Sequence, residues 1–261
     1  MEGRFLRLAG ILAGAVSAAV LLSVGAQSGQ ATLPEAPSWL GLPLTLGMDV
    51  QSLHDSDSTH EELPGLGHKF ELLGVAMDDQ APDNPTNDTI SMVTTPATIG
   101  IAFWDMPPGF HISALDGQLG FKYFFVNRSC GGGSPRLTLL VDANGDGTFD
   151  QSSGDFAAHG HPNPFVACPA NTWVYENLTD NGPHWEVTPG GAVEGIPVFP
   201  FSTWDTLEAA VTAQFPNHKV LAGFIVDDSC SFHLPACGEA HYDLVTIENR
   251  TLEQDQDTVR R

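Results

Sequence analysis

Short apolar segments alternate with turn-forming clusters along most of this chain. From about Leu66 onward, the apolar runs include KFELLGVAM, ATIGIAFW, LGFKYFFVN, RLTLLVD, KVLAGFIVD and YDLVTIEN. In residues 137–141 and 219–226, β-branched and aromatic residues dominate, and Gly, Asn or Asp closes each run, which is typical of strands. The 27 Gly and 19 Pro mark the turns between them. The pattern predicts an all-β fold of antiparallel sheets packed face to face, a jelly-roll-like β-sandwich.

One segment, FSTWDTLEAAVTAQFP, has a different periodicity. Its apolar residues recur at helical spacing: Trp204, Leu207, Val211 and Phe215. Ser202 can cap the N-terminus, Asp205 follows three residues later, and Pro216 stops the run. The pattern predicts one short α-helix near residues 203–215, with Trp204 on its buried face.

The N-terminal region has the features of an export signal. Arg4 and Arg7 precede an apolar run over residues 8–26 that ends in small residues. We expect cleavage after Ala26, or else after Ala31, and a secreted protein. The alternative is an uncleaved membrane anchor, because about 18 apolar residues just span a bilayer. Residues 27–65 are then an extended lead-in, residues 66–252 the β-sandwich domain, and residues 253–261 a charged tail.

The chain is strongly acidic. Its 32 Asp and Glu outnumber its 10 Lys and Arg, which gives a formal net charge of −22. Such a surface repels phosphate groups, so we expect neither nucleic acid nor an anionic membrane surface as a partner.

The four cysteines form an even set behind an export signal, which predicts two disulfides. Of the three pairings, we favour Cys130 with Cys168 and Cys230 with Cys237, because the second pair closes a tight loop. The alternative, a zinc site of four thiolates, lacks any C-x-x-C spacing and fits an oxidising compartment poorly.

The stretch VDANGDGTFD, residues 141–150, concentrates oxygen ligands. Counted from Asp142, oxygen-bearing side chains stand at positions one, three, five and nine, namely Asp142, Asn144, Asp146 and Asp150. Thr148, at position seven, offers its backbone carbonyl, and the glycine at position six permits a sharp turn. The stretch resembles the calcium loops of EF-hands, dockerins and thrombospondin type 3 repeats. The resemblance implies a structural calcium ion held by these five residues.

The match to the EF-hand is incomplete. Position twelve is Ser153 where a bidentate Glu is expected, and the flanks are not helices. The resemblance to the EF-hand therefore covers the order of the ligands and not the two helices. Asp155 is a further candidate for the missing carboxylate. The alternative is a type I′ hairpin turn, for which Asn-Gly and Asp-Gly are preferred dipeptides, and both interpretations stay open.

Other metal and nucleophile motifs are weaker. His159 and His161 have the H-x-H spacing that can chelate zinc or copper, but a polar loop with incidental histidines is the favoured interpretation. A nucleophile elbow needs G-x-S-x-G, and CGGGSPR has Ser134 without the closing glycine.

A glycosidase needs two facing carboxylates. Asp227, Asp228 and Asp243 stand at strand ends, but their spacing selects no pair, so we interpret each as a turn residue.

Among the tryptophans, Trp173 and Trp185 flank the turn-rich YENLTDNGPHW and are our candidates for exposed, sugar-stacking rings.

The segment AHYDLVTIENRTL is similar to the closing strand of carbohydrate-binding modules and lectin-like jelly rolls, where a Y-D-x-V-x-I pattern runs along the sheet edge. Here the pattern is Tyr242, Asp243, Val245 and Ile247. FFVNRSCGGGSPR and VDDSCS are also similar to segments of exported bacterial proteins of uncharacterised function. The resemblance implies a lectin-type sandwich.

We therefore expect an exported, non-catalytic protein that binds a glycan or cell-surface component through loops at one end of the sheets. The alternatives are a secreted glycosidase or polysaccharide lyase on the same fold, and a purely structural envelope protein.

Overall fold

A computed structural model of the protein describes residues 70–117, 119–131, 134–165, 167–232, 236–247 and 250–252. The expected signal at 1–26, the lead-in at 27–65 and the tail at 253–261 lie outside these described residues. Within the described ranges, none of the helices has both the length and the hydropathy of a membrane-spanning segment.

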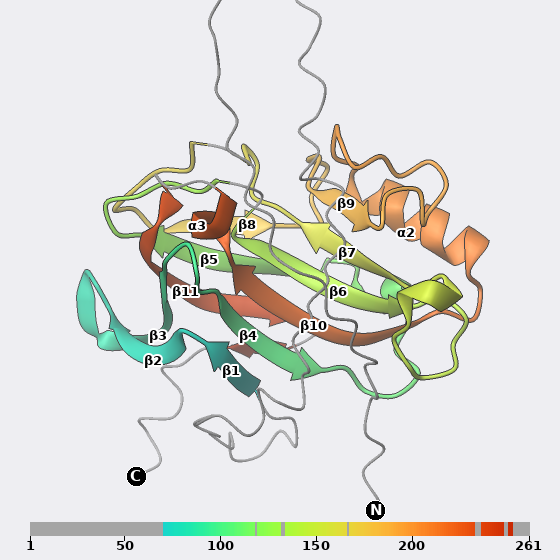
Figure 1. Ribbon diagram of the computed structural model, residues 1–261, viewed down its shortest axis with the longest axis horizontal. Helices are drawn as coiled ribbons and strands as arrows, with labels where there is room; N and C mark the ends of the chain where they lie inside the picture. The colour runs from blue at the N-terminus through green and yellow to red at the C-terminus, as the bar shows by residue number, and fades with distance from the viewer. Residues whose placement is uncertain are drawn as a thin grey trace, which may run out of the picture.

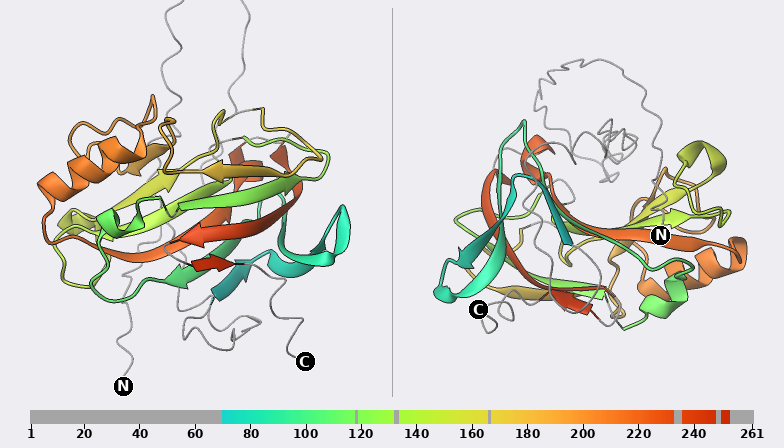
Figure 2. Two further views of the ribbon diagram at one scale, coloured as in Figure 1. Left: turned by 180° about the vertical axis from the view of Figure 1, so that it is seen from behind. Right: turned by 90° about the horizontal axis from the view of Figure 1, so that it is seen from below.

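Strands form two antiparallel sheets (Figures 1 and 2). Across sheet A the order is β1 (Phe70–Gly74), β4 (Gly100–Asp105), β10 (Lys219–Asp227), β6 (Arg136–Asp142), β7 (Phe156–Gly160) and β9 (Trp185–Thr188). Across sheet B it is β2 (Ala76–Ala81), β3 (Asn84–Thr94), β11 (Gly238–Ile247), β5 (Leu119–Phe125) and β8 (Val174–Asn177), and β12 (Arg250–Leu252) also pairs with β11. The predicted all-β sandwich is confirmed.

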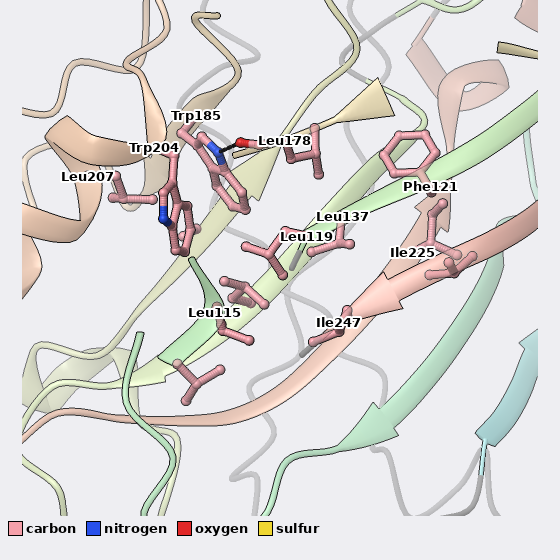
Figure 3. Close-up of a cluster of buried hydrophobic side chains, with 14 of the residues drawn as sticks. Leu115, Leu119, Phe121, Leu137, Leu178, Trp185, Trp204, Leu207, Ile225 and Ile247 are labelled. Carbon is pink, nitrogen blue, oxygen red and sulfur yellow. Dashed lines mark hydrogen bonds between the residues drawn. The ribbon is translucent and has the colours of Figure 1, made fainter. Parts of the chain in front are cut away.

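The core lies between the two sheets because alternate residues of each strand point inward. In β5, Phe121, Tyr123 and Phe125 are buried against the other sheet, while Lys122 points the opposite way. Leu137 of β6 and Ile247 of β11 belong to the same cluster, shown in Figure 3.

The predicted helix forms as α2 (Trp204–Gln214) beside β9 at one edge of sheet A (Figure 1). Thr203 caps it, accepting a hydrogen bond from the backbone N–H of Thr206, so the expectation that Ser202 caps the helix is wrong. Trp204 is fully buried, as predicted, with its ring centroid 5.0 Å from that of Trp185. The shorter helical segments are η2 (Ile112–Leu115), η3 (Gln151–Ser153) and α3 (Ser229–Phe232).

Both predicted disulfides are confirmed. Cys130–Cys168 joins the segment after β5 to the segment before β8 and spans 38 residues. Cys230–Cys237 spans 7 residues and ties α3 to the start of β11. The two bonds therefore fasten neighbouring connections at the same end of β5, β10 and β11.

Candidate ligand-binding face and metal loop

Residues 143–155 connect β6 to β7 and form a long, curled loop. The cross-strand pair Val141 and Phe156 lies at its base, and η3 lies within it, so the two-residue type I′ hairpin considered from the sequence is wrong. Gly145 and Gly147 have φ angles of 79° and 89°, in the left-handed region that glycine adopts without strain. These two glycines allow the loop to curl back toward Asp142.

Asp142 organises this curl. Its Oδ1 accepts a hydrogen bond from the Gly145 N–H and its Oδ2 one from the Gly147 N–H, each at 2.6 Å. Further along, Asn144, Asp146 and Asp150 each accept a bond from the backbone N–H two residues on. A carboxylate oxygen has further lone pairs, so these bonds orient the oxygens and leave them able to bind a cation. Thr148 lies in the same loop, and the calcium site stays a prediction.

Asp155 closes the loop from its other end. Its side chain is fully buried, and it accepts hydrogen bonds from the N–H groups of Ala143 at 2.8 Å and Asp150 at 2.6 Å. Burial raises the pKa of Asp155, and the nearby charges of Asp142 and Asp146 raise it further against the lowering effect of these two donors. Among the described residues, neither Asp142 nor Asp155 forms an ion pair with a basic side chain. A divalent cation would offset this buried negative charge.

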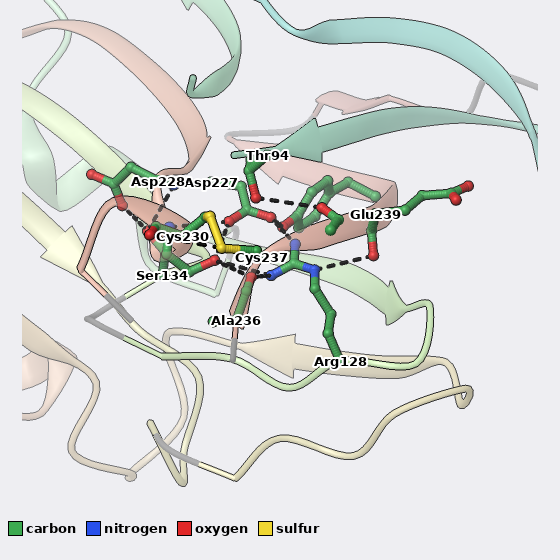
Figure 4. Close-up of polar contacts among 12 residues, drawn as sticks. Thr94, Arg128, Ser134, Asp227, Asp228, Cys230, Ala236, Cys237 and Glu239 are labelled. Atoms are coloured by element: carbon green, nitrogen blue, oxygen red, sulfur yellow. Dashed lines mark hydrogen bonds and ion pairs between the residues drawn. A yellow bond between two sulfur atoms is a disulfide. The ribbon is translucent and has the colours of Figure 1, made fainter. Parts of the chain in front are cut away.

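Asp227 and Asp228, two of the three acids weighed as candidate catalytic carboxylates, are held by different arginines, and Figure 4 shows Arg128 beside Asp227. The guanidinium of Arg128 pairs with Asp227, which also accepts a 2.7 Å hydrogen bond from the Tyr242 hydroxyl. Arg136 makes two hydrogen bonds of 2.8 Å to the two carboxylate oxygens of Asp228. Each acid therefore has its own buried counter-charge.

The surroundings of Asp228 favour its ionised form. Burial alone would raise its pKa, but the charge and hydrogen bonds of Arg136, together with the hydroxyl of Ser134, bring it below its ordinary value. An acid held ionised in this way is a poor proton donor. Ser134 donates to Asp228 and accepts from Arg136 at 2.9 Å, so its hydroxyl belongs to the same ion-pair network.

His159 lies in strand β7, so the interpretation of HGH as a polar loop is wrong for this residue. Its Nδ1 is 2.9 Å from the Thr138 hydroxyl and its Nε2 is 2.8 Å from the Thr188 hydroxyl, and the ring is buried. Burial, and then the charges of Arg136 and His161, hold the pKa of His159 well below its ordinary value of 6.5. Because both ring nitrogens have hydroxyl partners, His159 serves the packing of sheet A.

The outer face of sheet B points away from sheet A and carries Lys122, Phe124, Tyr175 and His241. Cross-strand pairing places Tyr175 of β8, Lys122 of β5 and Asp243 of β11 in one row. Lys122 Nζ lies 3.7 Å from a carboxylate oxygen of Asp243, and Tyr175 is 52% exposed. The row thus joins an exposed ring to a partly exposed lysine, whose carboxylate partner Asp243 is buried.

The Tyr175 ring lies directly against the backbone of β5. A Cβ added to Gly120 would lie 2.6 Å from Tyr175 Oη and 3.0 Å from Cζ, so only glycine leaves room beneath this ring. About half of the Tyr175 side chain remains exposed, at 52%, so part of the ring is open to solvent. Tyr175 was not among the rings predicted from the sequence; it lies in β8, two residues after Trp173.

Trp173, predicted as a ligand-binding ring, is partly exposed on this face. Lys122 lies over its ring at 4.6 Å, Phe124 packs 5.4 Å away, and its Nε1 donates to Asp83 at 2.9 Å. Asp83 lies in the turn between β2 and β3, and Trp173 lies just before β8, at the other edge of sheet B. The bond between them therefore shows that sheet B curls and brings its two edges together.

Trp185 lies elsewhere. It is fully buried, and its Nε1 donates to the Leu178 carbonyl at 2.7 Å (Figure 3), so the expectation of an exposed ring is wrong. The reason is that β9 lies between β7 and α2, which together enclose the ring.

Comparison of the sequence with models of known protein families and with curated proteins finds no match.

Proposed function

We propose that the protein is an exported, non-catalytic binding protein that holds a glycan on the outer face of sheet B. The observation that carries this proposal is the row formed by Tyr175, Lys122 and Asp243. A flat aromatic ring matches the apolar face of a pyranose, and the partly exposed ammonium of Lys122 beside it offers hydrogen-bond donors to the sugar hydroxyls, with the buried Asp243 holding that ammonium in place. Because the row is built on paired strands, little ordering is needed on binding.

Two features support export. The disulfides Cys130–Cys168 and Cys230–Cys237 are of the kind that persists in oxidising compartments, and the predicted signal at 1–26 would direct the chain there. Extracellular calcium would then be available to the loop of Asp142, Asn144, Asp146, Thr148 and Asp150. In this proposal the ion is structural, because the loop belongs to the β6–β7 connection of sheet A, whereas the ligand lies on sheet B.

The hydrolase alternative is less well supported. Asp227 and Asp228 are each neutralised by an arginine, and Asp243 is paired with Lys122. None of these acids is presented as one of two carboxylates facing across a substrate.

A glycan array probed with the oxidised protein in calcium tests the proposal. We expect wild type to retain a defined set of glycans and Tyr175→Ala to bind them roughly tenfold more weakly or worse, as expected for a central aromatic contact. The matched control is Phe199→Ala, because Phe199 is an equally exposed ring, at 57%, outside this face. The proposal fails if wild type retains no glycan, or if both variants bind as wild type does.

A further inference from the structure

Three side chains on the outer face of sheet B bring metal-ligating atoms together. Asp79 lies on β2, and Glu239 and His241 lie two residues apart on β11. One ligand atom from each lies within 4.8 Å of the others. β3 separates the two strands, and its pairs Asp79 with Thr89 and His241 with Ser91 place the side chains on one face.

The hydrogen bonds of His241 indicate which nitrogen faces the two acids. The Thr89 hydroxyl lies 3.3 Å from the Asp79 backbone carbonyl, to which it can donate, and 2.9 Å from His241 Nδ1, from which it can then accept. With the proton on Nδ1, Nε2 carries a lone pair, and it faces a carboxylate oxygen of Glu239 at 2.7 Å. Two lone pairs at this distance repel each other unless a proton or a cation lies between them.

The charge around this cluster also favours a cation. Among the described residues, neither Asp79 nor Glu239 forms an ion pair with Lys or Arg. Lys122 is engaged by Asp243, and the guanidinium of Arg128 pairs with Asp227. Figure 4 shows the Glu239 carboxylate pointing away from that guanidinium. Arg128 bonds to the backbone carbonyl of Glu239, at 3.1 Å, and not to its side chain.

We propose that His241 Nε2 and the carboxylates of Asp79 and Glu239 bind a divalent transition-metal ion, with zinc as the best match. Imidazole nitrogen with carboxylate oxygens suits Zn²⁺, whereas Ca²⁺ takes oxygen ligands only. Three protein ligands leave a coordination position for water or an external ligand. Thr89 acts as a positioning residue, because its bond to Nδ1 fixes the ring and directs Nε2 to the metal.

The cluster is independent of the calcium loop and of glycan binding. The loop lies in sheet A, and the three ligands of the proposed zinc site share no side chain with the row of Tyr175, Lys122 and Asp243. His241 is cross-strand from Phe124, so the metal would lie on the same outer face. Failure of either site would leave the other untouched.

Zinc titration of the full chain in saturating calcium, followed by calorimetry, tests this proposal. We expect one Zn²⁺ per chain, and affinity roughly tenfold lower or worse in Glu239→Gln. Glu194→Gln is the matched control, since it makes the same charge change at an exposed glutamate away from the cluster and should bind as wild type. Thr89→Val should also weaken zinc binding, with the visible absorption of bound Co²⁺ changed, because Nε2 loses its orientation.

Three results would overturn the proposal. One is the absence of zinc binding to wild type. Another is equal affinity in Glu239→Gln and Glu194→Gln. The third is zinc binding that survives Glu239→Gln and is lost in His161→Gln, which would place the ion at the H-x-H pair on sheet A.

Discussion

At the scale of single residues, the acid at the end of β10 has a structural role that can be measured. Asp227 is fully buried, and its carboxylate accepts bonds from Arg128, Tyr242 and Ser229. Asp227→Asn would leave the buried guanidinium without its counter-charge, so we expect the free energy of unfolding to fall by roughly 3–5 kcal/mol. Urea unfolding measures this change. Asp116→Asn, at an exposed acid, should change it by less than about 0.5 kcal/mol, and an equally small effect for Asp227→Asn would contradict the assigned role.

The buried imidazole of His159 makes stability depend on pH. Its pKa lies well below 6.5 in the folded protein, because of burial, Arg136 and His161, and returns to that ordinary value on unfolding. As pH falls below 6.5, the unfolded chain takes up a proton that the folded one does not, so stability is present above this pH and is lost below it.

We expect His159→Gln to have a flatter pH dependence, by up to about 1.4 kcal/mol per pH unit. Denaturant unfolding from about pH 7.5 to about pH 5 measures both slopes. The variant also loses contacts to Thr138 and Thr188, so only the slope is compared. Identical slopes would show that His159 does not titrate as described.

The sequence predicted which segments form strands better than it predicted which side chains are exposed on them. Trp173 and Trp185 flank the same turn-rich segment, yet Trp173 packs against Lys122 and Phe124 on the outer face of sheet B and Trp185 lies in the core. The two rings are separated because the segments that carry them join different sheets, and the local sequence pattern does not reveal the order of strands in a sheet. The same is true of Asp79 and His241, which lie far apart in the sequence and meet only through β3.

At the scale of elements, strands with continuous β-branched and aromatic runs were predicted well. β6 and β10 match the runs RLTLLVD and KVLAGFIVD residue for residue. β3, with the sequence NPTNDTISMVT, was not recognised, because its first half is polar and contains a proline. The helix was predicted to within a residue at each end, but its cap was assigned to Ser202 where Thr203 makes the bond.

The β6–β7 loop should respond to calcium. At a concentration about 100 times the dissociation constant, binding adds roughly 2.7 kcal/mol of stability, which for a domain of this size raises Tm by roughly 5–10 °C. Asp146→Asn keeps the side-chain acceptor for the Thr148 N–H and removes the charge of an exposed acid, so the shift should shrink. Asp116→Asn should keep the full shift. Thermal melting in chelator and in calcium measures all three proteins, and an unchanged wild-type Tm would contradict the calcium site.

The two disulfides should differ in their effect on stability. Loop-closure entropy predicts a loss of about 4 kcal/mol when both cysteines of Cys130–Cys168, which spans 38 residues, become alanine. The same change at Cys230–Cys237, which spans 7 residues, should cost about 2.5 kcal/mol. Denaturant unfolding of the two double variants measures both losses in the free energy of unfolding. A larger loss for Cys230–Cys237 than for Cys130–Cys168 would show that restriction of the unfolded chain is not the main effect of these disulfides.

At the scale of the whole molecule, the two sheets have different surfaces. Sheet A carries the calcium-like loop, whereas sheet B presents an exposed Tyr175 and a partly exposed Lys122, whose partner Asp243 is buried beneath it. The sequence suggested binding through loops at one end of the sandwich. The proposed glycan site is instead on the face of sheet B, because Tyr175 is the exposed ring that adjoins a charged pair.

A crystal structure of the protein with a glycan retained on the array tests glycan binding at this face most directly. We expect a sugar ring stacked on the exposed side of Tyr175, with hydroxyls within hydrogen-bonding distance of the Lys122 ammonium. A sugar bound at the loops at one end of the sandwich, or anywhere on sheet A, would contradict the account.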